Sequence, residues 1–112
     1  MGVLRKLTLK EENLIDFLIL KENLNINSNW RKDILAFSMN DGKMGSLKLC
    51  PEGIYDDKIE HVCSFISEYE FKDSDGVDAV ASLFLDANGN LYELDIWKVD
   101  FSELLSLPDV KK

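Results

Sequence analysis

The sequence is poor in residues that cross-link a chain or bind metals. It has two cysteines, two prolines and one histidine among 112 residues. Cys50 and Cys63 lack the Cys-x-x-Cys spacing of metal and redox motifs, so we predict reduced thiols. With His61 as the only imidazole, a zinc site would also need a carboxylate ligand. We therefore predict no metal site and no cofactor.

Long apolar runs are also missing. The longest, residues 17–20, is far shorter than the roughly 20 residues that span a bilayer. The N-terminal segment, residues 1–10, lacks the apolar core and the cleavage site of a signal peptide. A myristoylation motif would begin at Gly2, but Lys6 stands where that motif has serine or threonine. These absences predict a cytoplasmic protein with no membrane partner.

Catalytic signatures are equally scarce. The sequence contains no phosphate-binding loop, no Gly-x-Ser-x-Gly and no Cys–His pairing that suggests a nucleophile. The segments 73–76 and 86–89 begin like calcium loops, but glycine stands at the fourth position instead of the sixth. Glu93 and Asp95 could form a carboxylate pair, although nothing else suggests a sugar cleft. We therefore favour a protein without catalytic activity.

Charge is unevenly distributed along the chain. Residues 1–48 carry a net charge of +2 and residues 49–112 carry −10, which gives −8 for the whole sequence. Such an acidic protein repels phosphates, which argues against nucleic acid and anionic membranes as partners. The acidity favours either solubility alone or a basic protein as the partner.

The strongest structural signal is a hairpin over residues 77–101. Two apolar runs flank residues 86–90, and the Asn88-Gly89 pair can adopt the positive φ angles of a tight turn. Side chains alternate between the faces of the second strand. The more apolar face carries Tyr92, Leu94, Ile96, Lys98 and Asp100. The mixed face carries Leu91, Glu93, Asp95, Trp97, Val99 and Phe101. We assign the more apolar face to the core, and a concave binding surface could form on the other.

Two registers of this hairpin are open. A two-residue Asn-Gly loop would pair Ala81 with Ile96. A type I turn followed by a glycine bulge would instead pair Val80 with Ile96. We favour the second register, because aspartate suits the first position of a type I turn. It also places Asp78 beside Lys98, which brings opposite charges together across the strands.

A capping box marks the start of an N-terminal helix. Thr8 stands at the N-cap and Glu11 follows three residues later. We predict a helix from about Leu9 to Glu22 with a broad apolar face. The asparagine-rich stretch 23–29 predicts a loop. Trp30 is expected to plug the junction between helix and sheet, with a ligand platform as the alternative.

The middle of the chain predicts a pair of short strands. Residues 33–39 form the first strand and residues 45–49 begin its return strand, with a turn at residues 40–42 between them. Residues 50–58 contain proline, glycine and paired aspartates, which predicts a loop.

The segment 59–72 fits both helical and alternating periodicity. We choose a strand, because the turn at residues 73–76 leads directly into the hairpin. Ser102 is predicted to cap a short helical turn through Leu105, which Pro108 stops. Together these elements predict one α+β domain over residues 1–112, with an N-terminal helix packed on an antiparallel β-meander of four to five strands.

Four segments carry a resemblance to a known family. They are residues 5–8, 41–47, 73–77 and 91–102, and the last of them is LYELDIWKVDFS. The chain resembles a family of small bacterial proteins of unknown function that carries this type of C-terminal segment. The resemblance transfers no catalytic residues, because that family has no established activity. As a small acidic domain, the chain is similar in class to the immunity proteins of bacterial toxin systems.

These observations predict a non-catalytic, immunity-like protein-binding module with a basic protein as its partner. The alternative is a small-molecule-binding protein or minor enzyme with a pocket between helix and sheet. The candidate binding residues are Glu93, Asp95, Trp97, Trp30 and Tyr92. The Trp97 ring could anchor a recognition surface or be packed in the core, and we favour the core. Glu93 and Asp95 are expected either near solvent or satisfied by hydrogen bonds at the rim of a groove, because unpaired buried carboxylates are costly.

Overall fold

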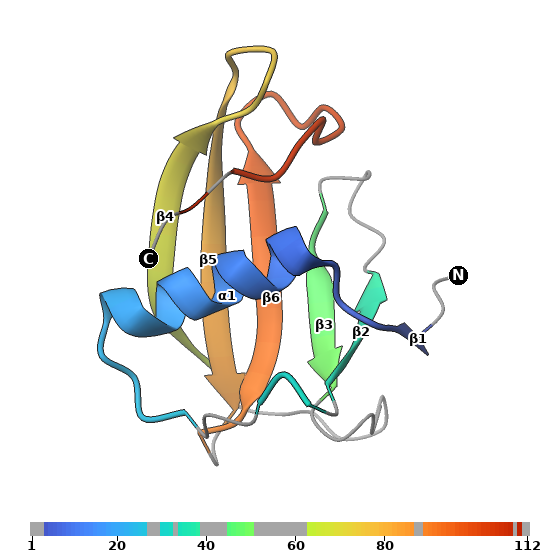
Figure 1. Ribbon diagram of the computed structural model, residues 1–112. Coiled ribbons are helices and arrows are strands. Elements are labelled where there is room, and N and C mark those ends of the chain that lie inside the picture. The colour runs from blue at the N-terminus through green and yellow to red at the C-terminus, as the bar shows by residue number, and fades with distance from the viewer. Residues whose placement is uncertain are drawn as a thin grey trace.

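The described residues form one antiparallel sheet of six strands with a helix across one face (Figure 1). The computed structural model describes residues 4–26, 30–32, 34–38, 45–50, 63–86, 89–108 and 110. The helix is α1, Leu9–Lys21. The strands are β1 (Leu4–Arg5), β2 (Leu35–Ser38), β3 (Leu47–Cys50), β4 (Cys63–Lys72), β5 (Asp78–Asp86) and β6 (Leu91–Lys98). The predicted α+β class and antiparallel sheet are confirmed.

The strand order is β1-β2-β3-β6-β5-β4, so the sheet is not a single meander. Two three-stranded meanders meet where β3 pairs with β6. The prediction of four to five strands in one meander is therefore wrong in both respects. Strand β1 has two residues and pairs Leu4 with Phe37, which is too short for any periodicity to show. The crossover from β3 to the far edge of the sheet leaves no local signal in the sequence.

The capping box is confirmed in detail. The Thr8 hydroxyl accepts a hydrogen bond from the Glu11 backbone N–H at 3.2 Å, and the Glu11 carboxylate accepts one from the Thr8 N–H at 2.9 Å. Arg5 also donates two hydrogen bonds of 2.8 Å to that carboxylate. Burial opposes ionisation of Glu11, but these hydrogen bonds outweigh it and lower its pKa. The start of the helix is thus tied to the edge strand.

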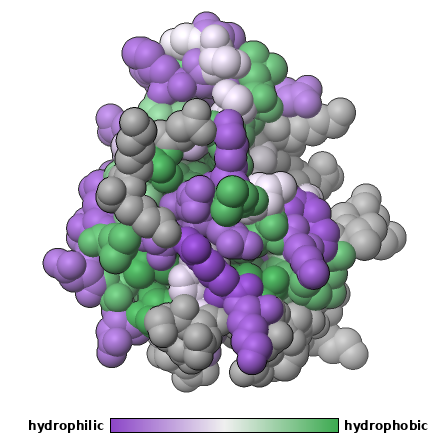
Figure 2. All heavy atoms as spheres, viewed as in Figure 1, coloured by the Kyte–Doolittle hydropathy of each residue, from purple (hydrophilic) through white to green (hydrophobic). Residues whose placement is uncertain are grey.

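The core lies between α1 and the sheet. Leu14, Ile15 and Leu18 of the helix have no exposed surface. Small residues of β5, Ala79 and Ala81, are equally buried in the same core. Polar side chains cover much of the middle of the helix side of the molecule (Figure 2), and Leu9 and Leu20 are also exposed on the helix. A helix can approach the sheet closely where the facing side chains are small, which explains the position of the two alanines.

Residues 99–108, named the C-terminal strap here, cross the sheet on the same side as the helix (Figure 1). Leu104 and Leu107 of the strap pack against the core. The strap contains no regular helix, so the predicted helical turn from Ser102 to Leu105 is wrong. Ser102 donates its backbone N–H and its hydroxyl to Asp100. The prediction failed because the strap is held by distant residues and not by its own local hydrogen bonds.

The glycine of the central hairpin turn is as predicted, whereas residues 87 and 88 of the turn lie outside the described residues. Gly89 has φ +82° and donates its N–H to the Asp86 carbonyl at 3.0 Å. The favoured register is nevertheless wrong, because the pairing shifts beyond the turn. Leu85 pairs with Leu91 but Phe84 pairs with Glu93. Tyr92, which lies between Leu91 and Glu93, is therefore an extra residue on β6 and forms a bulge.

The shift restores the register of the shorter loop along the rest of the strands. Ala81 pairs with Ile96, and Ala79 pairs with Lys98. This register places the small residues of β5 under the helix. Asp78 forms an ion pair with Lys72 of β4 and not with Lys98 of β6. The expected Asp78–Lys98 pair, which favoured the other register, is therefore not formed.

The choice of strand for the ambiguous segment is confirmed over residues 63–72. The predicted return strand is also confirmed, as β3, and the first strand is confirmed over residues 35–38. The predicted turn at residues 40–42, residues 51–58 of the predicted loop and the start of the ambiguous segment at 59–62 lie outside the described residues. Cys50, predicted as the first residue of that loop, is instead the last residue of β3. No helix in the described ranges combines the length and apolar character that crossing a bilayer requires.

Candidate functional site

The face of the sheet opposite the helix carries the candidate site. Here it is called the open face, and it comprises Glu68, Glu70 and Lys72 of β4, Asp78, Val80 and Ser82 of β5, Asp95 and Trp97 of β6, and Val99. The register sets Val80 directly between Glu70 and Trp97 across three strands. One step further along, it sets Ser82 between Glu68 and Asp95. Side chains on these rows project away from the core, because their neighbours in sequence are buried under the helix.

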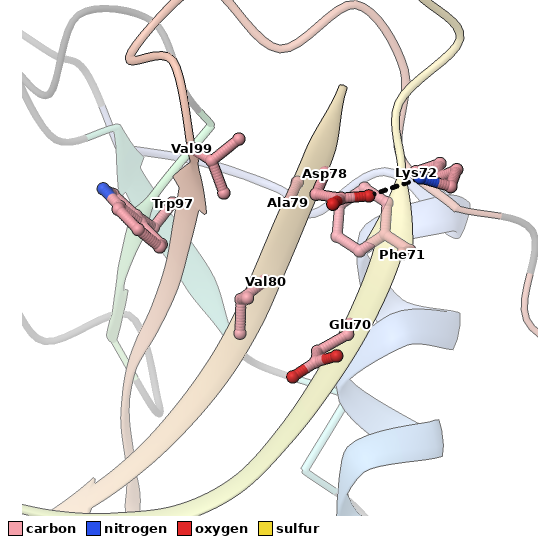
Figure 3. Close-up of a pocket in the computed structure, with 8 residues that line it drawn as sticks. All are labelled: Glu70, Phe71, Lys72, Asp78, Ala79, Val80, Trp97 and Val99. Carbon is pink, nitrogen blue, oxygen red and sulfur yellow. Dashed lines mark hydrogen bonds and ion pairs between the residues drawn. The ribbon is translucent and has the colours of Figure 1, made fainter. Parts of the chain in front are cut away.

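A shallow depression of about 440 Å³ lies on the open face. Trp97 and Val99 border one side, and Val80 lies in the middle (Figure 3). Glu70 and the paired Lys72 and Asp78 border the other side, and Phe71 and Ala79 also contribute to the lining. The depression therefore combines an apolar floor with an aromatic wall and a charged wall.

Trp97 is 43% exposed, so the expectation that its ring is core is wrong. The neighbouring position, Lys98, takes the buried side of the strand instead. The Trp97 ring meets the Phe101 ring edge to face, with 5.9 Å between the ring centroids. Phe101 is itself 67% exposed. Two large aromatic side chains thus stand together at the surface, where burial by a partner would remove apolar area from water.

The backbone at Phe101 is strained. Its φ of +60° is in the left-handed region, which costs a non-glycine residue about 1 kcal/mol. The Phe101 N–H donates to the Lys98 carbonyl at 2.8 Å, which closes a turn directly after β6. This turn places Phe101 against Trp97. Strained backbone of this kind persists only where surrounding structure holds it.

Two acidic residues of the open face carry charge with no partner among the described residues. Glu68 and Glu70 are exposed and make no hydrogen bond or ion pair with any residue in the described ranges. By contrast, Lys72 and Asp78 neutralise each other at 2.6 Å. Sequence reasoning missed both glutamates. Their alternation with Tyr69 and Phe71 was the available signal, since it marks them as the solvent side of a strand.

Asp95 and Glu93 lie on the same side of β6 as Trp97, as predicted, but both are half-buried. Asp95 accepts a hydrogen bond of 2.9 Å from the buried hydroxyl of Ser46. Burial raises the pKa of Glu93, and the nearby Asp95 charge raises it further. In the strand register, Lys48 of β3 lies opposite Glu93 of β6. These contacts indicate that the two carboxylates are part of the sheet's own structure as much as of a surface for partners.

The remaining two candidate residues occupy different places. The Lys48 ammonium lies 4.9 Å from the centroid of the Tyr92 ring, so Tyr92 belongs with Glu93 near the turn end of the hairpin. Trp30 packs against the core. The Arg31 guanidinium lies 5.2 Å from the centroid of the Trp30 ring and 3.4 Å from Asp16 of α1. The structure therefore places Trp30 with the helix and apart from the other four candidates.

A buried ion cluster lies behind the open face. The Lys98 ammonium has no exposed surface and lies 2.8 Å from the Asp73 carboxylate and 2.7 Å from that of Asp75. It also donates a hydrogen bond of 3.1 Å to the Glu103 carbonyl in the strap. A lysine on the apolar face of a strand needs such partners, because burying an unpaired charge is costly. That need was the signal in the sequence, but nothing local identified the two aspartates as the partners.

The Asp73 side chain anchors the strap by accepting hydrogen bonds from the backbone of the strap. One carboxylate oxygen accepts the Leu105 N–H at 2.8 Å, and the other accepts the Ser106 N–H at 3.0 Å. The second oxygen also accepts the Ser74 N–H at 2.7 Å. Burial opposes ionisation of Asp73, but these hydrogen bonds and Lys98 outweigh it and hold its pKa well below the usual range. The carboxylate is therefore charged at any physiological pH.

A family model described as a domain of unknown function, DUF6984, matches residues 4–108. The chain belongs to this family. The match covers almost the whole sequence and confirms the predicted membership of a family without assigned activity. Neither the curated proteins nor the solved structures compared with the chain provide a match.

The buried cluster of Lys98, Asp73 and Asp75 is suited to a structural role and not to acid–base catalysis. A general acid or base works best with a pKa near the working pH. The pKa of Lys98 is raised: burial opposes its charge, but the two aspartates outweigh that effect. With the pKa of Asp73 lowered as well, both groups keep their charges near neutrality. Among the described residues, no group of three or more His, Cys, Asp or Glu side chains could hold a metal ion.

These pKa shifts predict that the protein loses stability in acid. The folded state holds the pKa of Asp73 and that of Glu11 below their unfolded values. Their contribution is therefore complete above about pH 5 and is lost progressively as the pH falls through and below 4. Glu93 has a raised pKa and opposes this trend over the same range. Urea unfolding between pH 3 and pH 7 should show a falling free energy of unfolding below pH 5, and a flat profile would contradict the assignment.

Proposed function

We propose that the protein is a non-catalytic binding module that receives a basic protein partner on its open face. The observation that carries the proposal is the exposed aromatic pair, Trp97 and Phe101, on a face that also presents the unpartnered Glu68 and Glu70. Aromatic side chains dominate binding energy where they are desolvated at the centre of an interface. Surrounding charges steer the partner and select its sign.

The overall charge supports the same kind of partner. The chain carries −8 in total, and an acidic protein attracts a basic one at long range and low salt. A second copy of the chain would bring like charges together, which is unfavourable. An immunity-like role, in which a bacterial cytoplasmic protein neutralises a basic toxin, is the form of binding that small size and acidity suggest.

The alternative of a ligand pocket between helix and sheet has less support. The depression described above lies on the opposite face of the sheet. On the helix side, Leu14, Ile15 and Leu18 fill the interface and have no exposed surface. We therefore place the interface on the open face.

Replacing Trp97 with alanine should weaken partner binding by about 2 kcal/mol, or roughly 30-fold in Kd. The fold should be little affected, because the ring is already partly exposed. Proteins retained at low salt from the cells that make this protein would be identified with the wild type as bait. The Kd of a purified partner would then be measured by calorimetry for both proteins.

Leu20→Ala is the matched control, because Leu20 is a 55% exposed apolar residue on the helix. The proposal requires full affinity for this variant and weak affinity for Trp97→Ala. Equal affinity of the two variants for the purified partner would remove the open face from the interface.

A further inference from the structure

The register gives the depression on the open face a definite shape. Glu70, Val80 and Trp97 stand side by side on three adjacent strands. Neighbouring strands are about 4.8 Å apart, so the backbones of the outer two residues lie roughly 10 Å apart. Val80 between them is the smallest side chain of the three. The result is a trough with an aromatic wall on one side and a carboxylate on the other (Figure 3).

The lining of the trough carries one uncompensated negative charge. Lys72 and Asp78 form an ion pair at 2.6 Å, so their charges cancel. Glu70 is exposed and has no partner among the described residues. An anionic occupant would be repelled by this carboxylate. A purely apolar occupant would strip water from it without replacing the lost hydrogen bonds, which is costly.

A long cationic side chain could contact both walls of the trough, the Trp97 ring and the Glu70 carboxylate. Its methylene groups can lie on Val80 and Val99, since such side chains cover apolar surface with their stems. Its charged end can then lie against the face of Trp97, where a cation is attracted by the ring electrons. The Glu70 carboxylate supplies the counter-charge. Arginine fits better than lysine, because a planar guanidinium stacks on an aromatic ring and donates two hydrogen bonds to one carboxylate.

We propose that the trough is a binding site for an arginine side chain of the partner, held between the Trp97 ring and the Glu70 carboxylate. The inference rests on the proposed function for its biological source, a basic protein. Its chemistry can be tested without the partner, because a single blocked amino acid contains the whole group that the trough recognises.

The test is an NMR titration of the ¹⁵N-labelled protein with Nα-acetyl-arginine amide. Nα-acetyl-citrulline amide is the matched probe, because it has nearly the same shape and no charge. We expect saturable, millimolar shifts of the Trp97 indole N–H and of the Glu70 and Val80 amides with the arginine probe. The indole N–H of Trp30, on the helix side, should not move. The citrulline probe should bind at least tenfold more weakly, because it lacks the cation.

Glu70→Gln isolates the role of the carboxylate. This variant should lose about twofold to fivefold of its affinity for the arginine probe. It should keep the wild-type melting temperature, because the side chain has no partner among the described residues. Glu22→Gln, at the end of the helix, removes the same charge elsewhere and should bind the probe like the wild type. Equal binding of the arginine and citrulline probes would overturn the proposal. Arginine shifts that are identical in wild type and Glu70→Gln would also overturn it.

The titration and the partner experiment can fail independently. Arginine binding at the trough, together with full partner affinity for Trp97→Ala, would overturn the proposed function and leave the arginine site in place. Loss of partner affinity for Trp97→Ala, without any arginine binding, would overturn the arginine site and leave the open face as the interface.

Discussion

Replacing Asp73 with asparagine should lower the free energy of unfolding by about 3 kcal/mol, although the side chain hardly changes in size. Both carboxylate oxygens of Asp73 accept hydrogen bonds, one set from Leu105 and Lys98 and the other from Ser74 and Ser106. An asparagine has one acceptor oxygen. Its amide group would face donors on whichever side it lies, and the Lys98 charge would lose its fully buried partner.

The expected loss of unfolding free energy is at the lower end of the range for a broken buried ion pair. Asp75 remains as a partner for Lys98, and its side chain is 33% exposed, so water can reach the cluster on one side. Urea unfolding of the wild type and the variant measures the difference. Asp78→Asn is the control, because it breaks an exposed ion pair with Lys72 and should cost less than about 0.5 kcal/mol.

Hydrogen exchange distinguishes local release of the strap from general destabilisation of the protein. The amides of Leu105 and Ser106 should exchange much faster in Asp73→Asn, because their acceptor is impaired. Amides in the middle of β5 should show only the change expected from global unfolding. If Asp73→Asn were as stable as Asp78→Asn, the cluster would not hold the strap.

The second large effect is expected in the core. Leu18→Ala should cost about 3 kcal/mol, because the Leu18 side chain is fully buried between helix and sheet and its removal leaves a cavity. Leu20→Ala makes the same substitution two residues along the same helix. Leu20 is 55% exposed, so this control should change stability by no more than about 0.5 kcal/mol. Thermal or urea unfolding of the pair measures the difference, and equal losses would contradict the packing.

Features that depend on neighbouring residues could be predicted from the sequence. Thr8 and Glu11 fix the start of the helix through bonds that span three residues, and the prediction was correct. The glycine of the hairpin turn was also correctly assigned. Such local signals require no knowledge of the rest of the fold.

The register of the hairpin could not be predicted, because distant residues decide it. The charge of Lys98 was matched with Asp78 in the sequence argument, which favoured one pairing of the strands. In the structure Asp73 and Asp75 reach Lys98 from the turn between β4 and β5. The opposite charges on Lys98 and Asp78 therefore carried no information about register.

The candidate site was predicted in part. Alternation along β6 placed Trp97, Glu93 and Asp95 on one side of the strand, as in the structure. The contribution of β4 was missed, because Glu70 becomes a neighbour of Trp97 only through the pairing of three strands. No pattern within one strand shows which residues stand beside it.

The proposed function requires that the open face contacts a basic protein. The most direct test places a photoreactive phenylalanine analogue at Val99, which is 44% exposed at the rim of the depression, or at Leu20 on the helix. Each protein is irradiated in an extract of the cells that make it, at low and at moderate salt. We predict an adduct with a basic protein from Val99 alone, and less of it at moderate salt. The same adducts from both positions, or adducts from Leu20 alone, would contradict the claim.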